Sequence, residues 1–145
     1  MILDRKYGDD YVIKFKRGEI EQGLGIGIPE IDQYLCYKQS QLCIINGLDN
    51  VGKTSFMLWY FLLISIKWDK KFILWCGENK VGQQKRDLVQ FLSGKSFDEL
   101  NEAQINKFLK SINRRFEWVD NKQSYSYEAL YNIFEKSSAD CCLID

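Results

Sequence analysis

Apolar and mixed stretches alternate along the chain, and their lengths predict strands and helices that follow one another in turn. Short apolar runs between polar turns predict strands at residues 42–46, 72–76, 116–120 and 141–145. Longer stretches with apolar residues at helical spacing predict helices at residues 55–67, 80–92, 97–112 and 127–134. Strands that alternate with helices indicate an α/β fold, in which a mostly parallel sheet is covered by helices on both faces.

Polar residues mark where two of these helices begin. Ser96 and Glu99 have the spacing of a capping box, in which each residue satisfies a backbone N–H of the other. Ser124 or Ser126 is expected to cap the last helix.

The segment before the first predicted strand has weaker patterning. Residues 11–16 partly alternate between apolar and basic, which predicts an exposed strand or arm. Pro29 suits the first turn of a short helix at residues 30–35. We therefore expect an N-terminal arm or linker at residues 1–22 and a folded domain at residues 23–145.

Residues 47–54 read Gly-Leu-Asp-Asn-Val-Gly-Lys-Thr, a complete G-x-x-x-x-G-K-T phosphate-binding loop between a predicted strand and a predicted helix. In such a loop, glycines let backbone N–H groups close around phosphate oxygens, and the helix N-terminus adds partial positive charge. Lys53 is expected to reach the β- and γ-phosphates, and the Thr54 hydroxyl to ligate Mg²⁺. The alternative is a glycine turn that binds no ligand. The expected nucleotide-binding residues are Gly47, Leu48, Asp49, Asn50, Val51, Gly52, Lys53, Thr54 and Ser55.

Hydrolysis of a bound triphosphate needs further groups, and two acidic residues that follow predicted strands are candidates. Asp145, after Cys-Cys-Leu-Ile, has the form of the Walker B aspartate that serves the same Mg²⁺. Glu78 is expected at the carboxyl edge of the sheet, where it would act as a base or orient the attacking water. The alternatives are an ordinary strand-end aspartate and a glutamate that favours the start of a helix. Glu78 and Lys53 are thus the candidate catalytic residues.

Composition excludes several classes of protein. Lys+Arg and Asp+Glu both number 20, so a free-standing polybasic nucleic-acid binder is not expected, although a local basic lining remains compatible with DNA binding. The absence of histidine excludes histidine bases and mixed Cys/His zinc sites. The five cysteines form no C-x-x-C pair and are expected to be buried and reduced, which favours a cytoplasmic protein. The longest apolar run, residues 56–64, is too short to span a membrane.

Together these residues resemble the RecA-like ATPase core of ring-forming replicative DNA helicases of the DnaB type, including phage members. The phrase Gly-Ile-Gly-Ile-Pro-Glu-Ile-Asp at residues 25–32 is similar to the lead-in of that family, and the phosphate-binding loop follows at its spacing. Glu78 falls where the family places its catalytic glutamate, and Leu-Ile-Asp145 falls on its Walker B strand. The resemblance covers residues 23–145, and it departs from the family at Asn79, where the family has methionine.

The resemblance implies a three-layer P-loop NTPase that binds ATP and Mg²⁺ and unwinds duplex DNA in replication. It also implies a hexameric homo-oligomer that surrounds single-stranded DNA, in the cytoplasm of the cell or of a phage host. The family's sensor strand, DNA-binding loops and arginine finger come after the Walker B strand, so we expect the fold to be incomplete at the C-terminus and the isolated chain to have weak activity.

Two alternative functions stay open. The chain is also compatible with another RecA-like ATPase, such as a recombinase, a recombination mediator or a clock-type regulator. The second alternative is a truncated nucleotide-binding module with little turnover. It is favoured by the missing arginine finger, because an arginine supplied in trans raises the rate of related phosphoryl transfers by about 10³–10⁵-fold.

Overall fold

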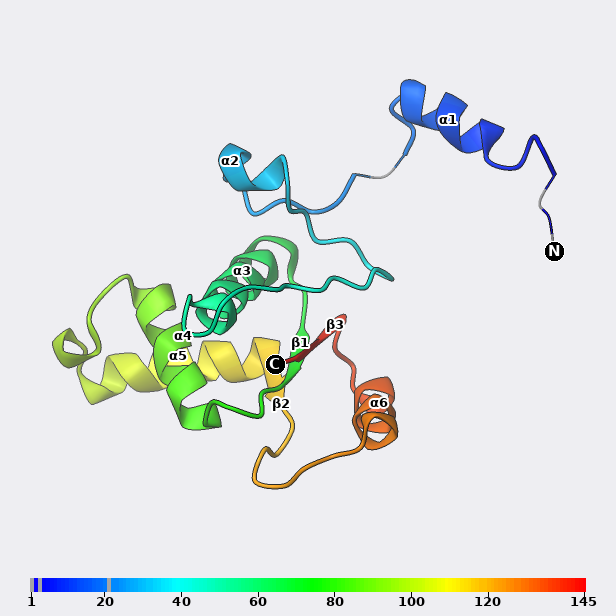
Figure 1. Cartoon of the computed structure of the whole chain (residues 1–145). Coiled ribbons are helices and arrows are strands. Elements are labelled where there is room, and N and C mark those ends of the chain that lie inside the picture. The colour runs from blue at the N-terminus through cyan, green and yellow to red at the C-terminus, as the bar shows by residue number, and fades with distance from the viewer. Residues whose placement is uncertain (1, 3, 21) are drawn as a thin grey trace. The chain divides into compact units, whose positions relative to one another are not determined.

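The computed structural model describes residue 2, residues 4–20 and residues 22–145 (Figure 1). The chain divides into two units, Met1–Lys38 and Gln39–Asp145. The predicted boundary after residue 22 stays a prediction.

A parallel sheet of three strands organises the larger unit. Its strands are β1 (Phe72–Trp75), β2 (Phe116–Trp118) and β3 (Cys141–Ile144), and their spatial order is β2-β1-β3. Phe72 pairs in register with Phe116 on one side and with Cys141 on the other. The parallel strands joined by helices confirm the predicted α/β class.

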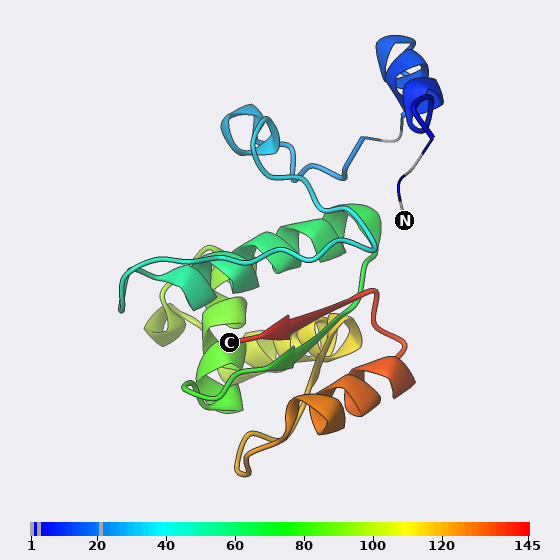
Figure 2. The same cartoon turned by 45° about the vertical axis from the view of Figure 1, so that its right-hand side comes forward.

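Helices cover both faces of this sheet. Successive side chains of β1 point to opposite faces, so neighbouring residues of this strand contact different helices. On one face, Phe72 is fully buried and stacks on Phe61 of α3 (Lys53–Trp68), with 4.2 Å between the ring centroids. On the other face, Ile73 forms an apolar cluster with Val119 and with Leu130 of α6 (Tyr127–Lys136). Figures 1 and 2 show α3 and α6 on opposite sides of the strands.

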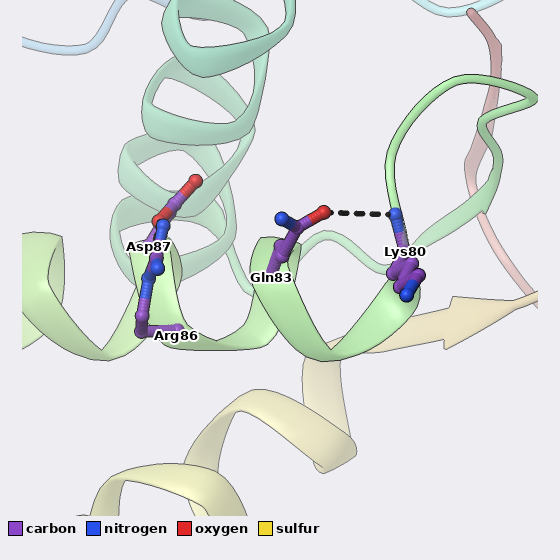
Figure 3. Close-up of polar contacts among 4 residues, drawn as sticks. All are labelled: Lys80, Gln83, Arg86 and Asp87. Atoms are coloured by element: carbon purple, nitrogen blue, oxygen red, sulfur yellow. Dashed lines mark hydrogen bonds and ion pairs between the residues drawn. The ribbon is translucent and has the colours of Figure 1, made fainter.

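Two further helices connect β1 to β2. The first is α4 (Val81–Ser93), where the backbone N–H of Lys80 donates to Oε1 of Gln83 at 3.3 Å (Figure 3). The same close-up shows Arg86 beside Asp87 on the next turn, where their side chains form an ion pair at 2.9 Å.

The second connecting helix, α5 (Glu102–Arg115), begins later than predicted. Ser96 and Glu99 do pair, since the Ser96 N–H donates to the Glu99 carboxylate at 2.9 Å, but they close only the short 3₁₀ turn η1 (Phe97–Glu99). The chain then becomes extended at Leu100, and the Asn101 side chain caps α5 by accepting from the N–H of Gln104 at 3.0 Å. The prediction of one continuous helix over residues 97–112 is therefore wrong.

Ser126, rather than Ser124, caps α6. Its hydroxyl accepts a hydrogen bond from the N–H of Ala129 at 3.2 Å.

The strand predicted at residues 42–46 is not formed, which is the largest error of the sequence-based prediction for this unit. Leu42 is 89% exposed and Ile44 82% exposed. A strand needs a neighbouring strand to satisfy its backbone, and within the described residues none pairs with this segment. Apolar composition alone indicated a buried strand, but it carried no information about a partner.

The smaller unit contains the helices α1 (Asp9–Lys16) and α2 (Pro29–Asp32). The prediction of a strand or arm at residues 11–16 is wrong, because this segment lies within α1. Asp10 and Lys14 form an ion pair one helical turn apart, at 2.7 Å. All side chains of α1 are exposed, so no buried face was present to fix the period of its apolar residues.

The short helix α2 confirms the expectation from Pro29, although it ends at Asp32. The Asp32 carboxylate accepts hydrogen bonds from the N–H groups of Ile26 at 2.7 Å and Gly27 at 2.8 Å. A Cβ atom on Gly25 would lie 2.5 Å from this carboxylate, so a larger residue there would displace the Asp32 side chain from these hydrogen bonds.

Candidate functional site

The N-terminus of α3 directly follows the glycine-rich loop and has no side-chain cap. Gly52 at the cap position adopts φ 87° and ψ 22°, a left-handed conformation that glycine adopts without strain. No acidic residue occupies the first turn. Asn101 and Ser126 cap α5 and α6, whereas the first amides of α3 have no such acceptor and remain suited to an anion.

Lys53 folds back over the loop that precedes it. Its Nζ atom donates hydrogen bonds to the carbonyl oxygens of Gly47 at 3.0 Å and Leu48 at 2.8 Å. An open hollow of about 400 Å³ borders Asn46, Gly47 and Leu48. The ammonium group is therefore held at the loop, beside open space.

The loop residues between these points project into solvent. Asp49, Asn50 and Val51 are exposed, and Asn50 adopts a left-handed φ of 58°. Ser55, in the first turn of α3, is also exposed.

The structure brings Thr54 and Asp145 into direct contact, although 91 residues separate them in the sequence. The Thr54 hydroxyl donates to Oδ2 of Asp145 at 2.7 Å. Asp145 follows β3 and is fixed by its backbone: its N–H donates to the Trp75 carbonyl at 3.0 Å, and its carbonyl accepts from the Gly77 N–H at 2.8 Å. The ends of β1 and β3 therefore hold this carboxylate next to the start of α3.

Glu78 lies in the loop between β1 and α4, one residue after Gly77. Its side chain is exposed, and in the described part of the chain its carboxylate has no hydrogen bond or ion pair. The loop is joined to Asp145 through the N–H of Gly77, but no hydrogen bond or ion pair joins the Glu78 carboxylate to Lys53, Thr54 or Asp145. The structure thus joins the predicted metal ligands Thr54 and Asp145 directly, whereas the predicted base Glu78 has no side-chain partner in the described residues.

Thr54 and Asp145 bring together a hydroxyl and a carboxylate oxygen, joined by a hydrogen bond of 2.7 Å. Oxygen atoms are the ligands that Mg²⁺ takes in proteins. Across residues 2, 4–20 and 22–145, no group of three or more acidic or cysteine side chains forms a metal site by itself. Mg²⁺ commonly takes only one or two protein ligands and completes its shell with water and phosphate.

Cys76, directly after β1, is buried. Burial, together with the negative charge of Asp145, raises the pKa of Cys76 to about 12. All five cysteines are free thiols, but only Cys76 is buried, and Cys43 and Cys142 are exposed. The expectation that the cysteines are buried is therefore wrong for most of them, since apolar neighbours in sequence did not ensure burial.

Sequence reasoning missed two residues near this site, Gln84 and Asn121. Their side-chain amides contact the backbone of the loop that carries Glu78. Neither belongs to a motif. Asn121 bonds carbonyls 42 and 45 residues away, and Gln84, besides its local bond to Asn79, accepts from Trp118, 34 residues away, so no local pattern indicated them.

Comparison of the chain with protein-family models, curated proteins and solved structures found no match. Within the described residues, none of the helices has both the length and the apolar character needed to cross a bilayer.

Proposed function

We propose that this chain binds ATP with Mg²⁺ at residues 47–55 and hydrolyses it. The observation that carries the proposal is the hydrogen bond between Thr54 and Asp145. In P-loop ATPases, a hydroxyl from the loop and a carboxylate from a neighbouring strand serve the same magnesium ion. Thr54 and Asp145 are our candidates for these two groups, and they meet at the carboxyl edge of a parallel sheet, which is where nucleotides bind in α/β folds.

The residues of the loop have separate roles in binding. Lys53 would exchange its two carbonyl acceptors for oxygens of the β- and γ-phosphates, which accept stronger, charge-assisted hydrogen bonds. The uncapped first turn of α3 would donate backbone N–H groups to the phosphates. Thr54 and Asp145 would hold Mg²⁺, which when bound neutralises negative charge on the phosphates.

Glu78 is the proposed base or water-orienting residue. Its carboxylate is exposed and has no partner among the described residues, so it is free to accept a hydrogen bond from a water. The residue before it, Gly77, donates a backbone hydrogen bond to Asp145, which links the loop of the proposed base to the proposed metal ligand.

At a finer level, we propose that this site belongs to a RecA-like motor of the replicative DNA-helicase type. The support is the order of the segments: the loop, the glutamate after β1, the helices α4 and α5, then the strand β2, and finally β3 with Asp145. In this proposal, the motor acts as a ring, a hexamer, on single-stranded DNA.

A second candidate is a nucleotide-binding module with slow turnover. The observation that favours it is that no hydrogen bond or ion pair in the described residues holds the Glu78 carboxylate. A base that is not held in place contributes little to the rate, since hydrolysis depends on positioning.

Steady-state ATP hydrolysis, measured with and without single-stranded DNA, tests the function and separates these candidates. For the helicase proposal, we expect turnover that DNA stimulates and that Glu78→Gln reduces by about 10²–10⁴-fold while nucleotide binding stays intact. Glu135→Gln, the same change at an exposed position of α6, is the matched control and should leave turnover unchanged. Turnover without DNA stimulation favours another RecA-like ATPase, and binding without turnover favours the binding module. Normal hydrolysis by Glu78→Gln would show that the base lies elsewhere.

A further inference from the structure

The loop that carries Glu78 is clamped from the side of β2 by one amide side chain. Nδ2 of Asn121 donates hydrogen bonds to the carbonyl oxygens of Cys76 and Asn79, both at 2.8 Å. Both partners are acceptors, so only the NH₂ group of Asn121 can serve them. These two carbonyls flank Gly77 and Glu78 in sequence, and Asn121 therefore closes the loop at both of its ends.

Gln84 supports the same loop from α4. This side chain is 2% exposed, and its Nε2 atom donates to the Asn79 carbonyl at 3.1 Å. Its Oε1 atom accepts from the indole N–H of Trp118 at 2.9 Å. The Asn79 carbonyl thus accepts two hydrogen bonds, which uses both of its lone pairs.

The opposite side of the loop is fixed by β3. The Gly77 N–H donates to the Asp145 carbonyl at 2.8 Å. The loop is therefore held between Asp145 on one side and Asn121 on the other, while the Glu78 carboxylate itself has no partner in the described residues. These contacts restrain the backbone on both sides of Glu78.

We propose that Asn121 is a positioning residue for the hydrolysis assigned to Glu78, with Gln84 supporting it. The inference rests on the proposed function. The hydrogen bonds of Asn121 go to the backbone of the loop and not to Thr54 or Asp145, so it acts by fixing the segment on which Glu78 is carried. Loss of its NH₂ group leaves two carbonyl oxygens without their donor and releases one side of the loop.

The test variant is Asn121→Asp, which keeps the size of the side chain and replaces the donor by an acceptor that repels both carbonyls. We expect kcat for ATP to fall by about 10–100-fold, because small displacements of a catalytic group cost that much, while KM changes by less than about threefold. Asn106→Asp, the same change at an exposed position of α5, is the matched control and should leave both parameters unchanged. Asn121→Ser is a milder variant that serves if the aspartate variant does not fold, as judged by circular dichroism and thermal unfolding.

A double-mutant cycle with Glu78→Gln shows whether Asn121 acts through Glu78. We expect Asn121→Asp to have no further effect on kcat in the Glu78→Gln background, because the group that it positions is already lost. Equal losses in both backgrounds, or an unchanged kcat in an active protein, would overturn the proposal for Asn121 and leave the proposed function standing. Absence of turnover by the unsubstituted protein would instead remove the proposed function and this inference with it.

A readout independent of turnover is hydrogen exchange of the backbone amides at residues 77–80. We expect faster exchange there in Asn121→Asp than in Asn106→Asp. In Asn121→Asp, the amides of α5 should exchange as they do in the unsubstituted protein. Unchanged exchange at residues 77–80 would contradict the clamp itself.

Discussion

At the scale of single residues, the two glycines of the phosphate-binding loop have different roles. Gly52 needs its left-handed backbone, with φ 87°, although a Cβ atom there would meet nothing within 4 Å. Gly47 has no positive φ, and an added Cβ atom would make only an ordinary contact, 3.6 Å from Cδ of Lys53. The conformation of the loop therefore depends on Gly52 much more than on Gly47.

This difference predicts unequal effects of alanine on stability. Gly52→Ala should lower the free energy of unfolding by about 1–2 kcal/mol, since a side chain in the left-handed region costs that much. Gly47→Ala should change it by less than about 0.5 kcal/mol, as expected for an exposed position without strain. Urea unfolding of both variants measures the difference, and an equal loss in the two would contradict the assigned roles.

Three residues of the candidate site could be singled out from local motifs. Lys53, Thr54 and Asp145 were predicted from the spacing of the loop and the form of the last strand, and the structure brings Thr54 and Asp145 together. Their binding of nucleotide and Mg²⁺ stays a prediction. Asn121 was missed because its partners are carbonyl groups 42 and 45 residues away, which no local pattern encodes.

At the scale of elements, the start of β3 is tied to the turn that precedes β1. The Asp140 carboxylate accepts from the Lys71 N–H at 2.9 Å and from Nζ of Lys70 at 3.0 Å. The backbone N–H of Asp140 in turn donates to the Lys71 carbonyl at 2.8 Å. Asp140 therefore helps to fix β3, and with it Asp145, beside β1.

These contacts lower the pKa of Asp140. Burial opposes ionisation, but the hydrogen bonds from Lys71 and Lys70 and the charges of both lysines outweigh it. A lowered native pKa stabilises the fold at pH values above the pKa of the unfolded chain, and this stabilisation disappears as the pH falls through the native pKa.

Asp140→Asn should therefore destabilise the protein at neutral pH and have a vanishing effect in acid. We expect a loss of up to about 1 kcal/mol near pH 7, in the range of partly exposed ion pairs. Urea unfolding at a series of pH values measures this gap, with Asp98→Asn at an exposed position as the control. A gap that stays constant down to strongly acidic pH would contradict the electrostatic account.

The elements that were predicted correctly are those with a local signal. Apolar periodicity located α3, α4 and α6, and short apolar runs located the three strands of the sheet. The predictions for residues 42–46 and 97–112 were wrong for different reasons. A strand at residues 42–46 depends on a partner strand, and the helix at residues 97–112 is interrupted because Asn101 offers a second cap.

At the scale of the larger unit, the candidate site is assembled where three strands end and one helix begins. Thr54 at the start of α3 meets Asp145 after β3, and the loop after β1 lies between Asp145 and Asn121, which follows β2. The parallel order of the strands makes this possible, because all their carboxyl ends point to one edge. The α/β class was predictable from the alternation of elements, whereas the contacts across this edge depend on the order β2-β1-β3, which the sequence did not reveal.

The most direct test of the central claim is calorimetric titration of the protein with ATP, in the presence of Mg²⁺ and in the presence of a chelator. The account predicts binding that Mg²⁺ strengthens, a loss of at least about tenfold in affinity for Lys53→Ala, and loss of the Mg²⁺ effect for Asp145→Asn. Lys67→Ala, at the far end of α3, is the control and should bind as the unsubstituted protein does. Failure of the unsubstituted protein to bind ATP in the presence of Mg²⁺, or equal binding by Lys53→Ala, would contradict the account.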